Sequence, residues 1–265
     1  TVPASSSDNF TITRDWVNRT NTIIIDGEVR KSACIDSSAN TEELNLLYPE
    51  KYFLTLFKEH LENAGIKVDD GIDLQKLKEN SVYLASIDRD IDTVLSDLNK
   101  ESDNLNAEMI VYAIALKDSG APASAVNGLA AIKELIDSLN LNSDDYFIAD
   151  GSGVSHYNLV SAKLLLEALK YIYYERKDLF DTFYNSLAIA GVDGTLKKRM
   201  KISPVEGNVH AKTGTLKGVS NLSGYVTSKN GHLLAFSILI QNFVEQYSKA
   251  RNFQDKICIL LTEFK

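Results

Sequence analysis

Residues 208–218 read Asn-Val-His-Ala-Lys-Thr-Gly-Thr-Leu-Lys-Gly and lead into a strand-like run. A lysine on a strand, here Lys212, holds a compact positive charge at a fixed point. The hydroxyls of Thr213 and Thr215 can donate hydrogen bonds to a carboxylate. Gly214 has no side chain to block an extended ligand along the strand edge. This stretch therefore predicts a carboxylate-binding strand, although a Lys-Thr-Gly tripeptide alone is also typical of an exposed turn.

The sequence around this stretch has the pattern of an antiparallel β-meander. Strands are expected at 209–213, 220–227 and 233–241, and Lys-Asn-Gly at 229–231 is a typical hairpin turn between the last two. A helical pattern at 244–261 follows them. Because mostly helical segments precede this meander, we predict an α+β fold with helices packed on a sheet.

Upstream, apolar residues recur mainly with the period of α-helices. Pro49 opens one helical pattern and Gly65 ends it, and Ser124 is expected to cap another helix. Helices are expected at 49–65, 90–100, 105–117, 125–139, 158–174 and 179–187. Strands are expected at 10–14, 21–25, 66–68, 81–86 and 146–149, with a turn at Asp26-Gly27 after the second strand.

Composition excludes several classes of protein. The chain has 265 residues, 44% of them hydrophobic and 24% charged, which is ordinary for a globular protein. A net charge of -8 argues against a nucleic-acid partner, which would select a basic surface. No apolar run is long enough for a membrane helix.

The first residues form no signal peptide and include no initiator Met, so we expect a processed or truncated chain. Cys34 and Cys258 are either disulfide-bonded or free thiols.

A second polar motif, Ser-Asp-Asn, stands at residues 102–104. Ser102 or Asp103 is expected to cap the helix that runs from Leu105. A helix start also holds side chains rigidly, so Ser102 can relay a proton and Asn104 can bind an amide. The same three letters at residues 7–9 have no helical pattern behind them, and we interpret that copy as chance.

Ser-Asp-Asn and Lys-Thr-Gly occur together, in this order, in serine hydrolases that also carry a Ser-x-x-Lys motif, including penicillin-binding proteins and class A β-lactamases. Four blocks narrow the resemblance. They lie at 100–108, 149–158, 190–196 and 210–225. These blocks resemble the D-alanyl-D-alanine carboxypeptidase/endopeptidase family of low-molecular-mass class C penicillin-binding proteins, peptidase family S13. The similarity extends upstream to 21–27 and to the helix at 49–65.

This resemblance implies a penicillin-binding/β-lactamase-like transpeptidase fold, with an antiparallel sheet flanked by helices. Residues 1–45 resemble the end of an inserted β-rich domain, and residues 46–265 an incomplete DD-peptidase domain. The implied activity is serine-type D-Ala-D-Ala carboxypeptidase or endopeptidase action on peptidoglycan stem peptides through an acyl-enzyme, with β-lactams as inhibitors. It implies no cofactor, no metal and no nucleic acid, and a periplasmic or cell-envelope location. The sequence does not indicate an oligomeric state.

The resemblance also implies roles for single residues. Ser102 would pass a proton to the leaving amine, Asn104 would bind the substrate amide, and Lys212 would supply positive potential. Thr213 and Thr215 would bind the terminal carboxylate beside Gly214, and the Thr215 backbone N–H would be one donor of the oxyanion hole.

The chain departs from the family pattern at the nucleophile, because no serine has a lysine three positions later. We therefore expect the acylating serine on a segment upstream of this chain. The alternatives are a non-catalytic peptidoglycan-binding module of the same fold and, with less support, a class A β-lactamase. Asp-Gly-Ser-Gly at 150–153 is interpreted as a tight turn, since it lacks the Gly-x-Ser-x-Gly elbow. His156 and His210 are not needed by the implied mechanism, and His210 is expected to pack locally.

Overall fold

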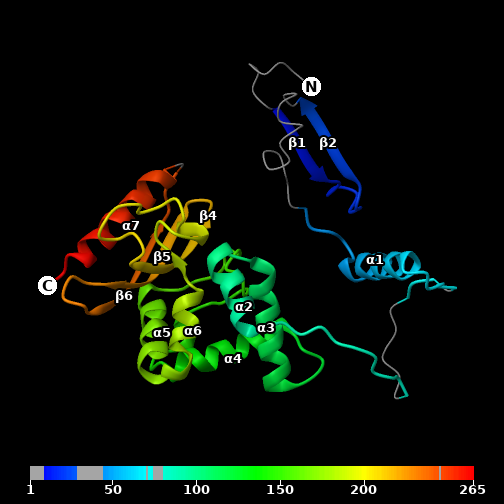
Figure 1. The fold of residues 1–265 in the computed structure, drawn as a ribbon, viewed down its shortest axis with the longest axis horizontal. Coiled ribbons are helices and arrows are strands. Elements are labelled where there is room, and N and C mark those ends of the chain that lie inside the picture. The colour runs from blue at the N-terminus through cyan, green and yellow to red at the C-terminus, as the bar shows by residue number, and fades with distance from the viewer. Residues whose placement is uncertain (1–8, 29–43, 70, 74–79, 245) are drawn as a thin grey trace. The chain divides into compact units, whose positions relative to one another are not determined.

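The computed structural model describes residues 9–28, 44–69, 71–73, 80–244 and 246–265 (Figure 1). The chain divides into two compact units, Thr1–Ala85 and Ser86–Lys265. The α1 helix therefore belongs to the first unit, whereas the sequence assigns it to the peptidase domain that starts at residue 46. The origin of residues 1–45 in an inserted domain stays a prediction.

The first unit contains a two-stranded antiparallel sheet, β1 (Asn9–Arg14) with β2 (Ile23–Glu28), and the helix α1 (Pro49–Asn63). The expected turn at Asp26-Gly27 is wrong, because both residues lie within β2. The chain reverses earlier, where the Asp15 carboxylate accepts hydrogen bonds from the backbone and side chain of Asn18. Asn21 then fixes the approach to α1 through paired hydrogen bonds with the Leu47 backbone.

Two short strands expected in and after the first unit do not form. Residues 66–68 and 81–86 have no regular secondary structure and no strand partner in the described part of the chain. Val82, Tyr83 and Leu84 are exposed, so the apolar β-like composition of this segment is not matched by burial. Strand formation depends on a neighbouring strand as well as on composition.

The second unit is built on an antiparallel sheet with the order β3-β4-β5-β6. Its strands are β3 (Ala188–Ile189), β4 (Val209–Leu216), β5 (Val219–Thr227) and β6 (Leu233–Gln241). These bounds confirm the three expected strands of the meander and extend the first of them. The hairpin between β5 and β6 closes at the expected turn, where the Ser228 N–H donates to the His232 carbonyl at 2.8 Å.

Side chains alternate across this sheet and form a hydrophobic cluster on each face. On one face, Leu222 and Val226 of β5 belong to the cluster that contains Cys258 of α7 (Tyr247–Thr262). On the other face, Tyr225 packs with Leu169 of α5 (Ala162–Glu175) and with residues of α6 (Lys177–Ser186). Figure 1 shows the sheet between α7 and these two helices. The predicted α+β layering is thereby confirmed.

The remaining helices of the second unit are α2 (Ile91–Ser96), α3 (Asn104–Ser119) and α4 (Ala125–Ser138). A π-helical turn, η1 (Asp97–Glu101), continues α2. The expected helix at 90–100 therefore forms as an α-helix followed by a π-helical turn. Gly120 ends α3 and the Ser124 hydroxyl caps α4, both as predicted. The 3₁₀ turns are η2 (Ser143–Asp145) and η3 (Gly194–Leu196).

One expected helix start and one expected strand in this unit are wrong. The helix predicted from residue 158 begins at Ala162. Asn158 belongs to the preceding loop, because its side chain forms hydrogen bonds with Ala149 and Asp150. Ser161 caps the helix instead. The strand predicted at 146–149 is reduced to a single bridge between Phe147 and Leu159.

Cys258 is fully buried and its thiol is free. Burial raises the pKa of this thiol to about 12, so it is protonated at neutral pH. Cys34 lies outside the described residues. Among the residues that the structure describes, no helix is long and apolar enough to cross a membrane, and no cluster of three or more His, Cys, Asp or Glu residues is arranged to hold a metal ion.

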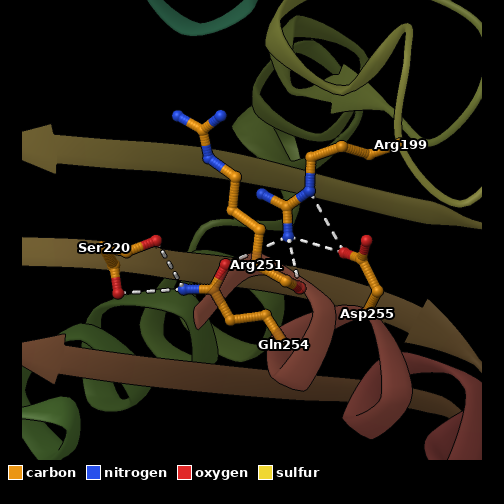
Figure 2. Close-up of polar contacts among 5 residues, drawn as sticks. All are labelled: Arg199, Ser220, Arg251, Gln254 and Asp255. Atoms are coloured by element: carbon orange, nitrogen blue, oxygen red, sulfur yellow. Dashed lines mark hydrogen bonds and ion pairs between the residues drawn. The ribbon is translucent and has the colours of Figure 1, made fainter. Parts of the chain in front are cut away.

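A polar network around the buried side chain of Gln254 fixes α7 to the sheet (Figure 2). The guanidinium of Arg199 donates to Asp255 Oδ1 at 2.6 Å and to Gln254 Oε1 at 3.0 Å. The amide of Gln254 in turn donates to the Ser220 carbonyl at 2.9 Å. Gln254 is fully buried and therefore links Arg199 to β5 without access to water.

We expect Gln254→Leu to lower the free energy of unfolding by about 1–3 kcal/mol. The change leaves the buried Ser220 carbonyl without its amide partner and removes one acceptor from Arg199. Urea denaturation followed by circular dichroism measures the difference. Asn252→Leu is the matched control, because Asn252 is an exposed amide on the same helix. Its expected change is within about 0.5 kcal/mol, and equal losses in the two variants would contradict the structural role of Gln254.

Candidate active site

The Ser-Asp-Asn motif lies at the junction between η1 and α3. Asp103 is the N-cap of α3, and its carboxylate accepts a hydrogen bond from the Asn106 N–H at 2.9 Å, which confirms the predicted cap. Asn104 is the first residue of the helix and is exposed. Ser102 stands just before the cap in a left-handed backbone conformation, with φ 62 and ψ 46. This conformation directs Ser102 out of both helical segments.

The structure brings the two sequence motifs together. Lys212 lies on β4, and its Nζ donates to Ser102 Oγ at 2.7 Å and to the Thr213 carbonyl at 2.9 Å. Burial lowers the pKa of Lys212 below its ordinary value of 10.5. A lysine with a lowered pKa beside a serine hydroxyl can exchange a proton with it and still present positive charge to an anion.

The rest of the predicted carboxylate-binding strand follows Lys212. Thr213 Oγ1 donates to Thr195 Oγ1 at 2.9 Å. Thr215 is exposed near the end of β4. A methyl group at Gly214 would meet only Asn221, at an ordinary contact distance of 3.5 Å. Packing therefore does not require a glycine at position 214. The effect of having glycine there is that no side chain covers the surface of the strand.

The predicted site residues are not all in mutual contact. In the described part of the chain, no side-chain hydrogen bond joins Asn104 or Thr215 to the Ser102–Lys212 pair. Asn104 is close to the pair along the chain, two residues after Ser102, and Thr215 lies on the same strand as Lys212. The geometry thus contains one direct polar contact between the motifs, with further polar groups on the same two elements.

Three residues beside this pair were missed from sequence. Lys100 forms an ion pair with Asp193 at 2.5 Å, and the second carboxylate oxygen of Asp193 accepts the Ile189 N–H at 2.8 Å. Thr195, two residues after Asp193, accepts the hydrogen bond from Thr213. Lys100, Asp193 and Thr195 all lie within the sequence blocks at 100–108 and 190–196, but nothing in their spacing indicates a contact.

The loop at 150–153 is a tight turn, as predicted. The Asp150 carboxylate accepts hydrogen bonds from the Gly153 N–H at 2.8 Å and the Ser155 N–H at 2.7 Å. The Glu108 carboxylate of α3 accepts the N–H groups of Gly151 and Ser152. These bonds fix the loop against α3 and give it a structural role.

His210 packs locally, also as predicted. Its ring stacks on Tyr184, with the ring centroids 4.0 Å apart, and its Nδ1 lies 3.3 Å from the Tyr184 carbonyl. Burial lowers the pKa of His210, which therefore favours the neutral ring. These contacts give no sign of a Ser-His pair.

One protein family matches almost the whole chain. The profile of the D-Ala-D-Ala carboxypeptidase 3 (S13) family matches residues 3–264. The chain belongs to that family. The match includes residues of both units, and the predicted resemblance is confirmed.

Individual relatives of this S13 chain cover much of its length. It is 33% identical over 199 residues to D-alanyl-D-alanine carboxypeptidase DacB of Haemophilus influenzae, which covers 73% of the chain and 41% of the relative. It is 32% identical over 254 residues to the D-alanyl-D-alanine carboxypeptidase of Actinomadura sp. strain R39, covering 92% of the chain and 45% of the relative. The chain therefore spans less than half the length of these curated relatives.

A solved structure shows the same fold for this S13 chain. Penicillin binding protein 4 (DacB) from Haemophilus influenzae, complexed with a novel β-lactam, matches with a TM-score of 0.70 and 25% identity. The match covers 94% of this chain and 59% of that structure. The predicted penicillin-binding fold is confirmed.

Proposed function

We propose that this chain provides one side of the active site, formed by Ser102 and Lys212, of a serine-type D-Ala-D-Ala carboxypeptidase. The enzyme would act on peptidoglycan through an acyl-enzyme. The observation that carries the proposal is the 2.7 Å contact between Lys212 Nζ and Ser102 Oγ, in a chain of the S13 family. This contact joins the proposed proton-relaying hydroxyl to a half-buried cation on an open strand.

In the proposed reaction, a nucleophilic serine attacks the carbonyl between the two D-alanines, and the C–N bond breaks. Ser102 delivers the proton that the departing amine needs, and Lys212 controls the charge state of that relay. Asn104 binds the amide of the acyl side of the peptide. The terminal carboxylate lies against Thr213 and Thr215, where Gly214 leaves room for it. The Thr215 N–H is one donor of the oxyanion hole.

The nucleophile is proposed to lie on a Ser-x-x-Lys segment outside residues 1–265, because no serine of this sequence has a lysine three positions later. We expect DNA upstream of the codon for Thr1 to encode that segment. The longer protein should then form a covalent adduct with fluorescent penicillin. Mass spectrometry should place the adduct on the Ser-x-x-Lys serine.

Three outcomes of this labelling separate the possibilities. An adduct on the upstream serine supports the proposal. An adduct on Ser102 would assign the attacking hydroxyl to the Ser102–Lys212 pair and contradict the proposed division of roles. No adduct on the longer protein, at any concentration tested, would favour the second candidate, a non-catalytic peptidoglycan-binding module, which the lack of Ser-x-x-Lys in this sequence motivates.

Properties of two relatives support the choice of ligands. One curated relative is a penicillin-sensitive carboxypeptidase, from Dictyostelium discoideum, and the solved relative described above holds a β-lactam. We therefore propose β-lactams as inhibitors and stem peptides that end in D-Ala-D-Ala as substrates. A peptidoglycan substrate places the protein in the periplasm or elsewhere in the cell envelope, which fractionation with an antibody against the chain would test.

A further inference from the structure

The position of Ser102 depends on a strained backbone. A non-glycine residue in the left-handed region costs about 1–3 kcal/mol at a site of this kind, and the conformation persists only where surrounding contacts hold it. Asp103 fixes the chain just after Ser102, through the cap of α3. The contacts that fix the chain before Ser102 come from Asn99 and Lys100.

Asn99 and Lys100 anchor the turn to two different elements. The amide of Asn99 donates to Ser186 Oγ of α6 at 2.8 Å, and both side chains are buried. Lys100 reaches Asp193, whose other oxygen is held by the Ile189 N–H, so the carboxylate has a fixed orientation. The side chains of Lys100 and Asp193 are only 19% and 33% exposed, which limits screening of this ion pair by solvent.

The backbone beside Asp193 also touches this turn directly. Gly194 has a φ of 52, and a methyl group there would lie 2.5 Å from the Lys100 carbonyl oxygen. The close approach of these two backbones therefore needs a glycine. Residues 193–195, here called the 193–195 bridge, thus contact the chain two positions before Ser102 through both a side chain and the backbone.

The far end of the 193–195 bridge contacts the other side of the site. The Thr195 hydroxyl accepts the hydrogen bond from Thr213, the residue next to Lys212 on β4. One three-residue segment therefore contacts the Ser102 turn at one end and the Lys212 strand at the other. Its length sets how far apart these two elements lie.

We propose that the 193–195 bridge and its ion pair with Lys100 hold Ser102 opposite Lys212. Lys100 and Asp193 are then positioning residues, and their catalytic consequence rests on the proposed function. Without the ion pair, the turn relaxes from the left-handed conformation, Ser102 Oγ moves away, and Lys212 loses its hydroxyl partner. The Nζ of Lys212 then becomes more accessible to reagents in solution.

The reactivity of Lys212 tests this positioning role in the chain itself. Brief treatment with acetic anhydride, followed by mass spectrometry, gives the acetylation rate of Lys212 relative to that of exposed Lys217. We expect Lys100→Met and Asp193→Asn to raise this ratio by about five- to tenfold, the range expected for loss of a charged hydrogen bond with partial solvent screening. Asp193→Asn keeps an oxygen that can accept the Ile189 N–H, so it removes mainly the charge.

Three controls separate positioning from general damage. Lys100→Arg keeps the positive charge and should leave the ratio near that of the wild type. Glu167→Gln breaks the Lys170–Glu167 ion pair within α5, which has a similar distance of 2.8 Å but joins no second element, and should leave the ratio unchanged. Cys258 is fully buried, so its alkylation marks molecules that have unfolded, and only molecules with Cys258 protected are counted.

The ratio of Lys212 to Lys217 acetylation in these variants decides whether the proposal holds. A raised ratio in Lys100→Met and Asp193→Asn, with restoration in Lys100→Arg, supports the proposal. An unchanged ratio in the two charge-removing variants, or the same rise in Lys100→Arg as in Lys100→Met, overturns it. Because the readout needs no peptidase activity, failure of the proposed function would leave this result intact and the two failures are distinguishable.

Discussion

Replacing Lys212 with methionine is expected to slow penicillin acylation of the proposed longer protein by roughly 10²–10⁴-fold, the range for loss of a group that takes part in proton transfer. The variant removes the cation that contacts Ser102 Oγ at 2.7 Å while keeping a side chain of similar length. Stopped-flow or gel-based measurement of adduct formation gives the rate. Lys217→Met, which removes an exposed lysine from the turn after β4, should react like the wild type.

The same variant should not destabilise the fold at neutral pH. Burial lowers the pKa of Lys212 in the folded chain, so the unfolded chain binds this proton more tightly. Stability contributed by this group therefore rises as pH increases from the folded pKa to the ordinary value of 10.5. Below that interval the buried charge is unfavourable, and Lys212→Met should raise the melting temperature. A lower melting temperature at neutral pH would show that the hydrogen bonds of Lys212 outweigh its desolvation.

Replacing Gly224 with alanine is expected to cost about 3 kcal/mol or more, and the chain should fail to fold at physiological temperature. Gly224 lies in the middle of β5, opposite Ala211 of β4. A methyl group there would lie 2.1 Å from the His210 carbonyl oxygen and 2.6 Å from Ala211 Cα. These are backbone atoms of the strand that carries Lys212, so the clash can be relieved only by separating β4 from β5.

Gly214→Ala is the matched control for stability, because it adds the same methyl group to a glycine of the neighbouring strand. That methyl group would meet only ordinary contacts. Its melting temperature should stay close to that of the wild type, even if the added group obstructs the proposed substrate edge. Similar losses of stability in both variants would mean that β-propensity, and not the close approach at Gly224, decides the outcome.

Local sequence patterns correctly predicted those helices, strands and caps that are determined by residues close together in the sequence. The β-meander, the Ser124 cap and the Gly120 stop of α3 depend on neighbouring residues, and the structure confirms them. The strand expected at 81–86 needed a partner strand, which no local pattern reveals. The turn expected at Asp26-Gly27 was displaced because the Asp15 side chain, through its bonds to Asn18, offers an earlier reversal.

The candidate site was predictable in its residues but not in all of its contacts. Ser102 and Lys212 were found because both motifs recur together in one class of serine hydrolase, and the structure places them in contact. The ion pair between Lys100 and Asp193 joins residues far apart in sequence. Charged residues are common on any protein surface. The partners in this ion pair are brought together only by the folded chain, so no sequence pattern indicates that they pair.

Release of D-alanine from a synthetic peptide ending in D-Ala-D-Ala tests the central claim most directly. The longer protein with wild-type Ser102 and Lys212 should release D-alanine, and Lys212→Met should release it more slowly by on the order of 10²–10⁴-fold. A peptide ending in L-Ala-L-Ala should not be cleaved. Equal rates in the wild type and Lys212→Met would contradict the assignment of the Ser102–Lys212 pair to the active site.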